Sequence, residues 1–209
     1  MPSDEGAGRT PAPKSFYVIR GLLKREAVSA LYDMLRPVHS YTRENTQSGF
    51  QLAAYPECLL HLAPIAATAS EMLGEPCGIL PTQSSCRLQS PTGEMSLGFH
   101  QDFDALKLKA NDLRGMTFWL PLHDIEANSP TLEIADNVQG IFNHHRDDCG
   151  YSVMEEQNRN KGPYTVLKIS AGDCAVFGPY AIHRTYIPRG ADRERLSLDV
   201  RCKPLSISR

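Results

Sequence analysis

The sequence lacks the features that would place the chain in a membrane or on nucleic acid. No apolar run in its 209 residues is long enough to cross a bilayer. Residues 1–6 have neither the basic region nor the apolar region of a signal peptide. The formal net charge of -2 gives no basic field that would attract nucleic acid. We therefore expect a cytoplasmic protein that binds neither membranes nor nucleic acid.

The sequence also lacks paired cysteines. Its six cysteines show no CxxC motif and no spacing typical of zinc sites. Buried thiols in a reducing compartment explain them at least as well as a disulfide framework. The length fits one domain with a sizeable core. We expect residues 1–14, rich in Pro, Gly, Ala and Ser, to be a disordered tail, and residues 15–209 to form a single domain.

The periodicity of apolar residues predicts helices near the start of the chain and strands after them. Residues 16–19 read as a strand, residues 24–36 as an amphipathic helix that ends at Pro37, and residues 62–73 as a second helix. Strands are then predicted at 85–89, 116–122, 131–134, 164–169, 174–177 and 195–201. No helix separates these strands, which favours a sandwich, barrel or jelly roll over a βαβ sheet. We expect a mainly β fold with two N-terminal helices packed on the β core.

One short motif could hold a metal ion. His100 and Asp102 are two residues apart on an extended segment, so their side chains point to the same side. The best candidate for a third ligand is His183, where an apolar run gives way to a polar loop. Two imidazoles and one carboxylate form the facial triad of non-haem Fe(II) oxygenases, which leaves coordination positions open.

A second HxD match, His145 and Asp147, shows how weak such a motif is by itself. Its neighbours are polar and charged and indicate a solvated surface turn. We therefore favour the first match. Of the other histidines, His39, His61 and His123 have no carboxylate at ligand spacing, and we expect them to be structural or exposed.

Several further segments resemble one family when they are taken in order. They are FYVIRGLL at 16–23, FHQDF at 99–103, TFWLPL at 117–122, SPTLEI at 129–134, AGDCAVF at 171–177, HRT at 183–185 and RERLSLDVR at 193–201. Together they resemble the phytanoyl-CoA dioxygenase-like family of Fe(II)/2-oxoglutarate oxygenases. The resemblance implies a double-stranded β-helix, which is a jelly roll of the cupin kind. Two departures are that residues 135–138 replace the family's Pro-Gly-Ser-His stretch and that the chain is short for the family.

The resemblance also implies an activity. Fe(II) would be held by His100, Asp102 and His183, with 2-oxoglutarate and O2 as cosubstrates. These would become succinate and CO2 while a small-molecule substrate is oxidised, most simply by hydroxylation. Because Asp102 supplies a carboxylate, no coordination position is freed for a halide, which argues against the related halogenases.

In this family an arginine about a dozen residues after the distal histidine binds the far carboxylate of 2-oxoglutarate. That position points to Arg195, with Arg193 as the fallback. An arginine suits the role because its planar fork matches a carboxylate. Strand alternation agrees, since Arg195 would share one face with other polar residues and the opposite face would be apolar. The alternative is that this polar row is the exposed face of an edge strand.

Four other residues are candidates for the cosubstrate pocket. Thr185 matches a family position whose hydroxyl helps to hold the same carboxylate, and Trp119 matches one that lines the pocket, although a lone Trp also fits a core position. Arg87 and Gln89 could reach 2-oxoglutarate or the substrate from a neighbouring strand. An ordinary structural hydrogen-bonding role is the alternative for both.

Residues 143–163 are polar and lie between strands, as either a mobile lid over the iron or a long surface loop without a gating role. Two other functions compete with the oxygenase. One is a non-catalytic jelly-roll binding protein that kept the fold and lost turnover. The other is a cupin-like metalloenzyme that does not use 2-oxoglutarate, in which Arg195 would have no obvious role.

Overall fold

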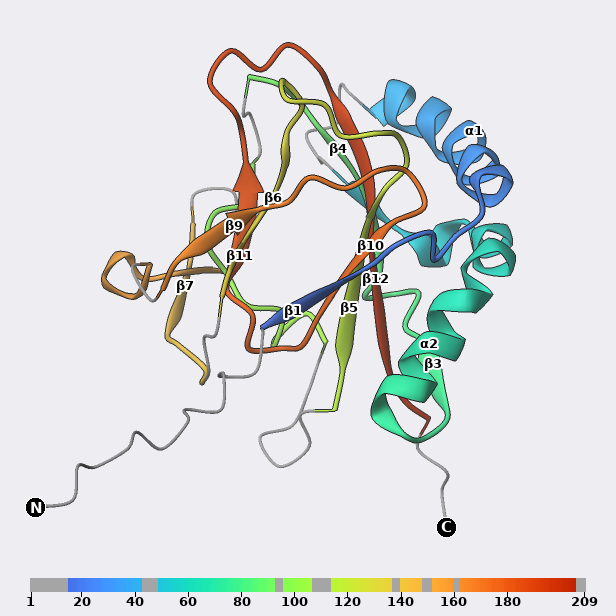
Figure 1. Ribbon diagram of the computed structural model, residues 1–209, viewed down its shortest axis with the longest axis horizontal. Helices are drawn as coiled ribbons and strands as arrows, with labels where there is room; N and C mark the ends of the chain where they lie inside the picture. Colours follow the sequence, from blue (N-terminus) through green and yellow to red (C-terminus); the bar gives the residue numbers. More distant parts are fainter. Residues whose placement is uncertain are drawn as a thin grey trace, which may run out of the picture.

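Two facing β-sheets, with helices on one side, make up the computed structural model of the chain (Figure 1). It describes residues 15–42, 49–92, 96–106, 114–136, 140–147, 152–159 and 162–205. The helical elements are α1 Arg25–Thr42, the 3-10 turns Leu52–Ala54, Pro56–Leu62 and Glu156–Asn158, and α2 Ala63–Leu73. The strands are β1 Phe16–Ile19, β2 Gly49–Gln51, β3 Cys77–Ile79, β4 Ser85–Gln89, β5 Met116–Pro121, β6 Thr131–Ala135, β7 His144–Arg146, β8 Ser152–Met154, β9 Tyr164–Val166, β10 Cys174–Phe177, β11 His183–Tyr186 and β12 Arg195–Pro204.

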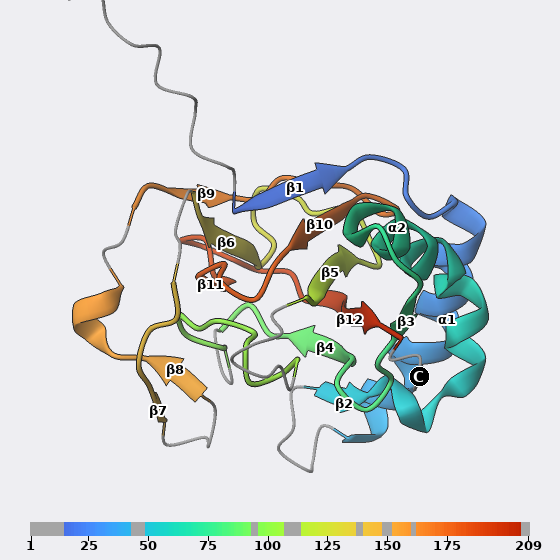
Figure 2. The ribbon, with the colours of Figure 1, turned by 90° about the horizontal axis from the view of Figure 1, so that it is seen from below.

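The larger sheet has the strand order β1-β10-β5-β12-β4-β2, and β3 also pairs with β12. The smaller sheet has the order β11-β6-β9, and β7 and β8 form a separate hairpin. All of the pairings are antiparallel. The two sheets lie opposite each other in Figure 2, so the chain crosses repeatedly between them. The mainly β architecture expected from the sequence is confirmed.

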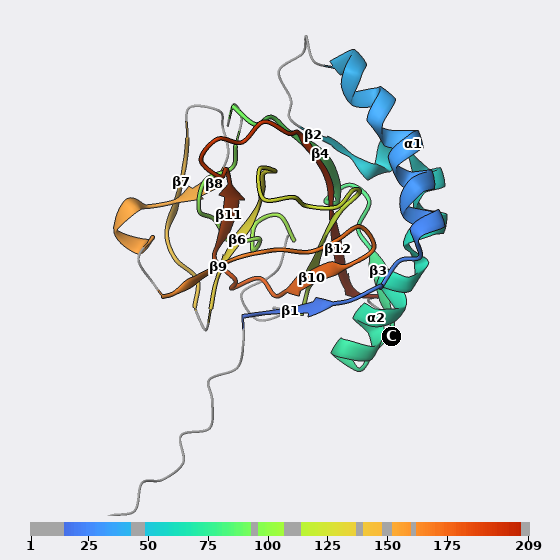
Figure 3. The same cartoon turned by 45° about the horizontal axis from the view of Figure 1, so that its top comes forward.

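Helices α1 and α2 lie against the outer face of the larger sheet (Figures 1 and 3). Leu31 and Leu35 of α1 and Ile65 of α2 are fully buried and belong to one cluster with Phe118 and Leu198 of the sheet. Burying side chains of this size contributes roughly 1.5–3 kcal/mol each. This layer is the main hydrophobic core, and it fixes which face of the larger sheet is turned inward.

Residues on β5 and β12 alternate between two environments. Phe118, Leu198 and Val200 face the helices, whereas Trp119 belongs to a second cluster with residues of the smaller sheet and of β10. Side chains that alternate along a strand must point to opposite faces of the sheet. The polar row of β12 therefore faces the space between the two sheets, and β12 is an inner strand rather than an edge.

Two local predictions differ from the structure. Pro37 was expected to end the first helix, but it lies inside α1, which continues to Thr42. A proline within a helix loses one backbone hydrogen bond and introduces a steric clash, and here the buried face of Leu31 and Leu35 still packs the helix onto the sheet. Residues 183–186, expected to begin a polar loop, form β11 because they pair with β6.

No helix in the described ranges combines the length and apolarity that a bilayer crossing requires. Residues 1–14, predicted as a disordered tail, lie outside the described residues.

Five cysteines in the described part of the chain are free and buried, as the interpretation of them as buried thiols predicts. They are Cys58, Cys77, Cys86, Cys174 and Cys202. Burial raises the pKa of Cys58 to about 11 and that of Cys202 to about 12.

We expect these buried thiols to resist alkylation in the native protein, because the thiolate is the reactive form and they are also shielded from the reagent. At pH 8, Cys58 should react about a hundredfold more slowly than in denaturant. Mass spectrometry of the alkylated peptides measures this difference. Equal labelling of Cys58 with and without denaturant would contradict the packing of the 3-10 turn on the sheet.

Candidate metal centre and its cavity

Three side chains that are distant in sequence meet between the two sheets. Possible ligand atoms of His100, Asp102 and His183 all lie within 4.8 Å of one another, and all three residues are buried. The Asp102 Oδ1 is 3.8 Å from Nε2 of His100 and 4.0 Å from Nε2 of His183. This is the trio predicted from the HxD motif and the distal histidine. Two imidazoles and a carboxylate at this spacing could hold one metal ion.

The two histidines are fixed through their backbones. His100 and His183 form an isolated antiparallel bridge, with N–H···O distances of 2.9 and 3.0 Å, and their ring centroids are 4.0 Å apart. Nδ1 of His100 lies 2.8 Å from the Gly98 carbonyl, and Nδ1 of His183 lies 3.0 Å from that of Ala181. A carbonyl accepts only from a protonated nitrogen, so the proton of the neutral form of each ring is on Nδ1. Each Nε2 then has a lone pair that can bind a metal ion.

The electrostatic surroundings keep His100 neutral. Burial, followed by the neighbouring His183, holds the pKa of His100 well below its ordinary value, although Asp102 acts in the opposite direction. A neutral imidazole is the form that binds a metal. The ring is therefore suited to metal binding at neutral pH.

Asp102 is held by two residues that were not predicted from the sequence. Arg201 donates from Nη2 to Oδ1 at 2.9 Å and from Nε to Oδ2 at 3.2 Å, while Thr117 Oγ1 donates to Oδ2 at 2.6 Å. Burial is the largest single influence and would raise the pKa of Asp102. The charge of Arg201, together with His183, His100 and the hydrogen bonds from Arg201, outweighs burial and holds the pKa well below its usual range. The carboxylate is thus ionised, and Oδ1 is the oxygen nearest to both imidazoles.

Strand register explains why Arg201 and Thr117 act together. They are direct partners in the pairing of β12 with β5, so both side chains point to the inner face. The sequence did contain a signal for Arg201, because it shares the parity of Arg195 on the predicted strand. Its partner could not be identified without the pairing.

A narrow cavity adjoins the three candidate ligands. Its lining consists of Arg87, Leu97, His100, Trp119, Leu132, His183, Thr185, Arg195, Asp199 and Arg201. Four of the five residues predicted to form a cosubstrate pocket therefore surround one space: Arg87, Trp119, Thr185 and Arg195. They come from four different strands, β4, β5, β11 and β12.

Arg195 is 2% exposed and has unused hydrogen-bonding capacity. Its Nη1 donates to the Thr131 carbonyl at 3.0 Å, and its guanidinium carbon lies 5.4 Å from the centre of the Trp119 ring. Its Nε is buried without a hydrogen-bond partner, and so is the hydroxyl of Ser197. Burial lowers the pKa of Arg195 to about 10, so the side chain keeps its charge at neutral pH.

Three other predicted candidates have different surroundings. Arg193, the fallback for Arg195, lies on the surface and pairs with Glu126 at 2.8 Å. Arg87 lines the cavity and donates from Nε to Asp199 at 2.9 Å. Gln89 is buried and lies opposite Arg195 in the strand register, but it is not part of the cavity lining.

The second HxD match is not part of the candidate metal centre. His145 and Arg146 are exposed on β7, as expected for a surface segment. Residues 143–163 were predicted to be either a mobile lid or a surface loop, and their described part contains the β7–β8 hairpin and a 3-10 turn. His39 lies in α1, where its side chain is outside the described part, and His61 is half-buried in a 3-10 turn.

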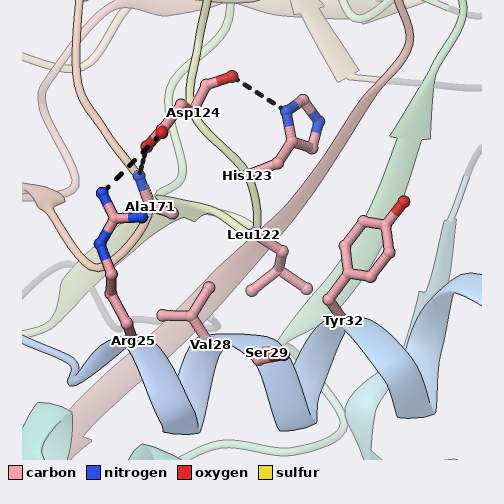
Figure 4. A pocket seen from close by; sticks show the side chains of 8 residues that line it. All are labelled: Arg25, Val28, Ser29, Tyr32, Leu122, His123, Asp124 and Ala171. Atoms are coloured by element: carbon pink, nitrogen blue, oxygen red, sulfur yellow. Dashed lines mark hydrogen bonds and ion pairs between the residues drawn. The ribbon is translucent and has the colours of Figure 1, made fainter.

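A larger hollow of about 410 Å³ lies outside the sheets, between α1 and the loop after β5 (Figure 4). Two of its polar residues, His123 and Asp124, form hydrogen bonds within the protein. His123 Nε2 accepts the N–H of Leu196 at 3.1 Å, and Asp124 Oδ1 accepts that of Ala171 at 2.9 Å. His123 is therefore structural, as expected. Within the described ranges, His100, Asp102 and His183 form the only group of three residues that could together hold a metal ion.

We expect removal of Arg201 to be strongly destabilising, because it would leave the buried Asp102 charge without a partner. The variant Arg201→Met should lower the free energy of unfolding of the metal-free protein by roughly 3–5 kcal/mol. Replacing both partners, with Asp102→Leu added, should recover most of that loss. Urea denaturation of the single and double variants measures the coupling. A loss below about 1 kcal/mol for Arg201→Met would contradict the ion pair.

The fold has counterparts among solved structures. No family model matches the sequence, and no curated protein matches it either. Among solved structures, the epimerase SnoN in complex with Fe3+, alpha ketoglutarate and nogalamycin RO is 15% identical, with a TM-score of 0.69 over 91% of this chain and 79% of that one.

Two further structures are similar to the same extent. EvdO2 from Micromonospora carbonacea var. aurantiaca, complexed with 2-oxoglutarate, is 15% identical with a TM-score of 0.71, over 92% of this chain and 87% of that one. EctD from S. alaskensis, with 2-oxoglutarate and 5-hydroxyectoine, is 12% identical with a TM-score of 0.71, over 97% of this chain and 79% of that one. At such identities the likeness shows the fold alone: a mostly β, jelly-roll-like architecture that is also found in 2-oxoglutarate-dependent enzymes.

Proposed function

We propose that the chain is an Fe(II)/2-oxoglutarate-dependent oxygenase that oxidises a small-molecule substrate. In this proposal residues 15–209 form one domain with a double-stranded β-helix core, related to the phytanoyl-CoA dioxygenase-like family. The observation that carries it is the combination of a buried His-Asp-His group with a buried, charged arginine in the same cavity, whose Nε has no hydrogen-bond partner. The jelly-roll-like fold, shared with enzymes such as SnoN and EctD, supports it.

The donor set fits iron. His100 and His183 offer Nε2 atoms, and carbonyls at Nδ1 fix their rings. Asp102 offers Oδ1, which also accepts from Arg201, while Oδ2 accepts from Arg201 and Thr117. Bound Fe(II) with 2-oxoglutarate and O2 would supply the oxidising chemistry, in which the cosubstrates become succinate and CO2. The protein's part is to orient the ligands and to exclude water.

The opposite wall fits the far carboxylate of 2-oxoglutarate. Arg195 lines the cavity, and its Nε is a buried polar atom without a hydrogen-bond partner. Such an atom costs free energy unless a ligand or water satisfies it. Thr185 adds a hydroxyl to the same cavity, and Trp119 packs beside the guanidinium. Arg87 is also close enough to line this space, although it is already paired with Asp199.

The same observation weighs against the competing functions. A cupin-like metalloenzyme without 2-oxoglutarate gives no role to a buried, charged Arg195. A binding protein that had lost turnover would have no need for a complete set of metal ligands with an ionised Asp102. The carboxylate of Asp102 also occupies the position that a halide would need, so a hydroxylase or a related C–H oxidation is favoured over halogenation.

We expect Asp102→Ala to abolish oxygenation, because the metal would lose its only anionic protein ligand. The assay is succinate formation with Fe(II), 2-oxoglutarate and O2, which detects uncoupled turnover without the natural substrate. His145→Ala, in the exposed second HxD match, should keep wild-type turnover. Near-normal turnover by Asp102→Ala would remove Asp102 from the triad.

We expect Arg195→Lys to weaken 2-oxoglutarate binding, because lysine cannot form the two parallel hydrogen bonds of a guanidinium. The loss of one charge-assisted bond, about 1.5–3 kcal/mol, corresponds to a rise of roughly 10- to 150-fold in the KM for 2-oxoglutarate. Arg193→Lys, on the surface, is the matched control and should leave this KM unchanged. A KM within twofold of wild type for Arg195→Lys would assign the carboxylate to another residue.

A further inference from the structure

Gln101 lies between two of the candidate metal ligands and points to the other side of their segment. It is 4% exposed, and every hydrogen-bonding group of its side-chain amide is used. Nε2 donates to the carbonyls of Gly140 and Tyr180, each at 2.7 Å, and Oε1 accepts the N–H of Phe142 at 2.9 Å. These partners define which end of the amide is nitrogen.

The bonds of Gln101 join three separate segments. Its own neighbours are His100 and Asp102, and Tyr180 comes three residues before His183. Gly140 and Phe142 belong to the segment that leads into β7. One buried side chain therefore ties both ligand-bearing segments to the approach to the β7–β8 hairpin.

The hairpin makes further contacts with the same ligand segments. His144 Nε2 accepts the backbone N–H of Gln101 at 3.1 Å, and the Met154 N–H donates to the Phe99 carbonyl at 2.7 Å. Met154 is fully buried in a small cluster with Ala135 and Ile182, the residue before His183. The hairpin is thus packed against the outer side of these segments, whereas the cavity lies on their inner side.

We propose that Gln101 is a positioning residue that sets the geometry of the metal ligands by fastening their segments to the β7–β8 hairpin. The inference rests on the proposed function. It gives the described part of residues 143–163 a structural role, which is to hold the ligand-bearing segments from their outer side. Only an amide can fill this position, because it must donate twice and accept once within a buried site. Loss of the amide leaves two carbonyls and one N–H unsatisfied, which releases the ligand segments.

The test uses Co(II) in place of Fe(II), since its visible absorption reports ligand geometry without any turnover. We expect Gln101→Met, which is similar in volume, to lower Co(II) affinity about tenfold or more and to change the Co(II) spectrum. Ser70→Ala is the control for general destabilisation. The Ser70 hydroxyl donates to the Ala66 carbonyl at 2.8 Å and accepts the Cys77 N–H at 2.9 Å, on the helix side of the larger sheet. Ser70→Ala should retain wild-type Co(II) binding.

A second variant acts from the hairpin side and covers the case in which Gln101→Met does not fold. His144→Leu removes the acceptor for the Gln101 N–H without altering Gln101 or a candidate ligand. We expect His144→Leu, like Gln101→Met, to lower the Co(II) affinity, by about threefold or more.

The outcomes separate the two proposals. If the wild-type protein binds Co(II), and both variants bind it within twofold of wild type with an unchanged spectrum, the positioning role is wrong and the oxygenase proposal stands. If the wild-type protein does not bind Co(II), the proposed function fails and the positioning role fails with it. A loss of affinity in Ser70→Ala equal to that in Gln101→Met would also overturn the positioning role, because it would reflect stability alone.

Discussion

The ion pair between Asp102 and Arg201 is the interaction on which the candidate metal centre depends. Burial opposes the charge on each partner, and each is stabilised there by the other. Because Arg201 contacts both carboxylate oxygens, the pair has one favoured geometry. Thr117 restrains Oδ2 further, so Oδ1 remains directed at the two imidazoles. An arginine on one strand thereby determines where a ligand on another segment can place its donor atom.

Strand β12 can do this because it lies inside the larger sheet, between β5 and β4. Its apolar residues pack under α1 and α2, and the row of Arg195, Ser197, Asp199 and Arg201 faces inward. Pairing on both edges fixes the register, and a slip of one residue would turn the charged row into the helix layer. The hydrophobic layer beneath the helices thus holds the guanidinium groups of Arg195 and Arg201 at their separate places in the cavity.

Residue spacing was sufficient for the part of the site that lies within one short segment, because the HxD spacing identified His100 and Asp102. The resemblance, not the periodicity, singled out Arg195, Thr185 and Trp119. Strand alternation agreed with a polar face at Arg195 but left open whether that face points inward. The contacts of Thr117 and Gln101 were not predicted, because they depend on which segments become neighbours. The same limit applies to Pro37, whose local signal to end the helix was overridden by the packing of α1.

The charges around the cavity explain why an anion fits it and why its ligand-free form is costly. Asp102 is neutralised by Arg201 and Asp199 by Arg87, so each carboxylate has a guanidinium partner. Arg195 donates to a carbonyl and lies over the face of Trp119, and the charge of Asp199, which is already paired with Arg87, offsets its burial only in part; a pKa of about 10 still keeps it charged. A buried cation in this state lowers the stability of the protein, since an apolar residue would fill the position without desolvation cost. A carboxylate ligand would remove that cost and pair with the charge where water is excluded, so the destabilising arrangement is itself a source of affinity.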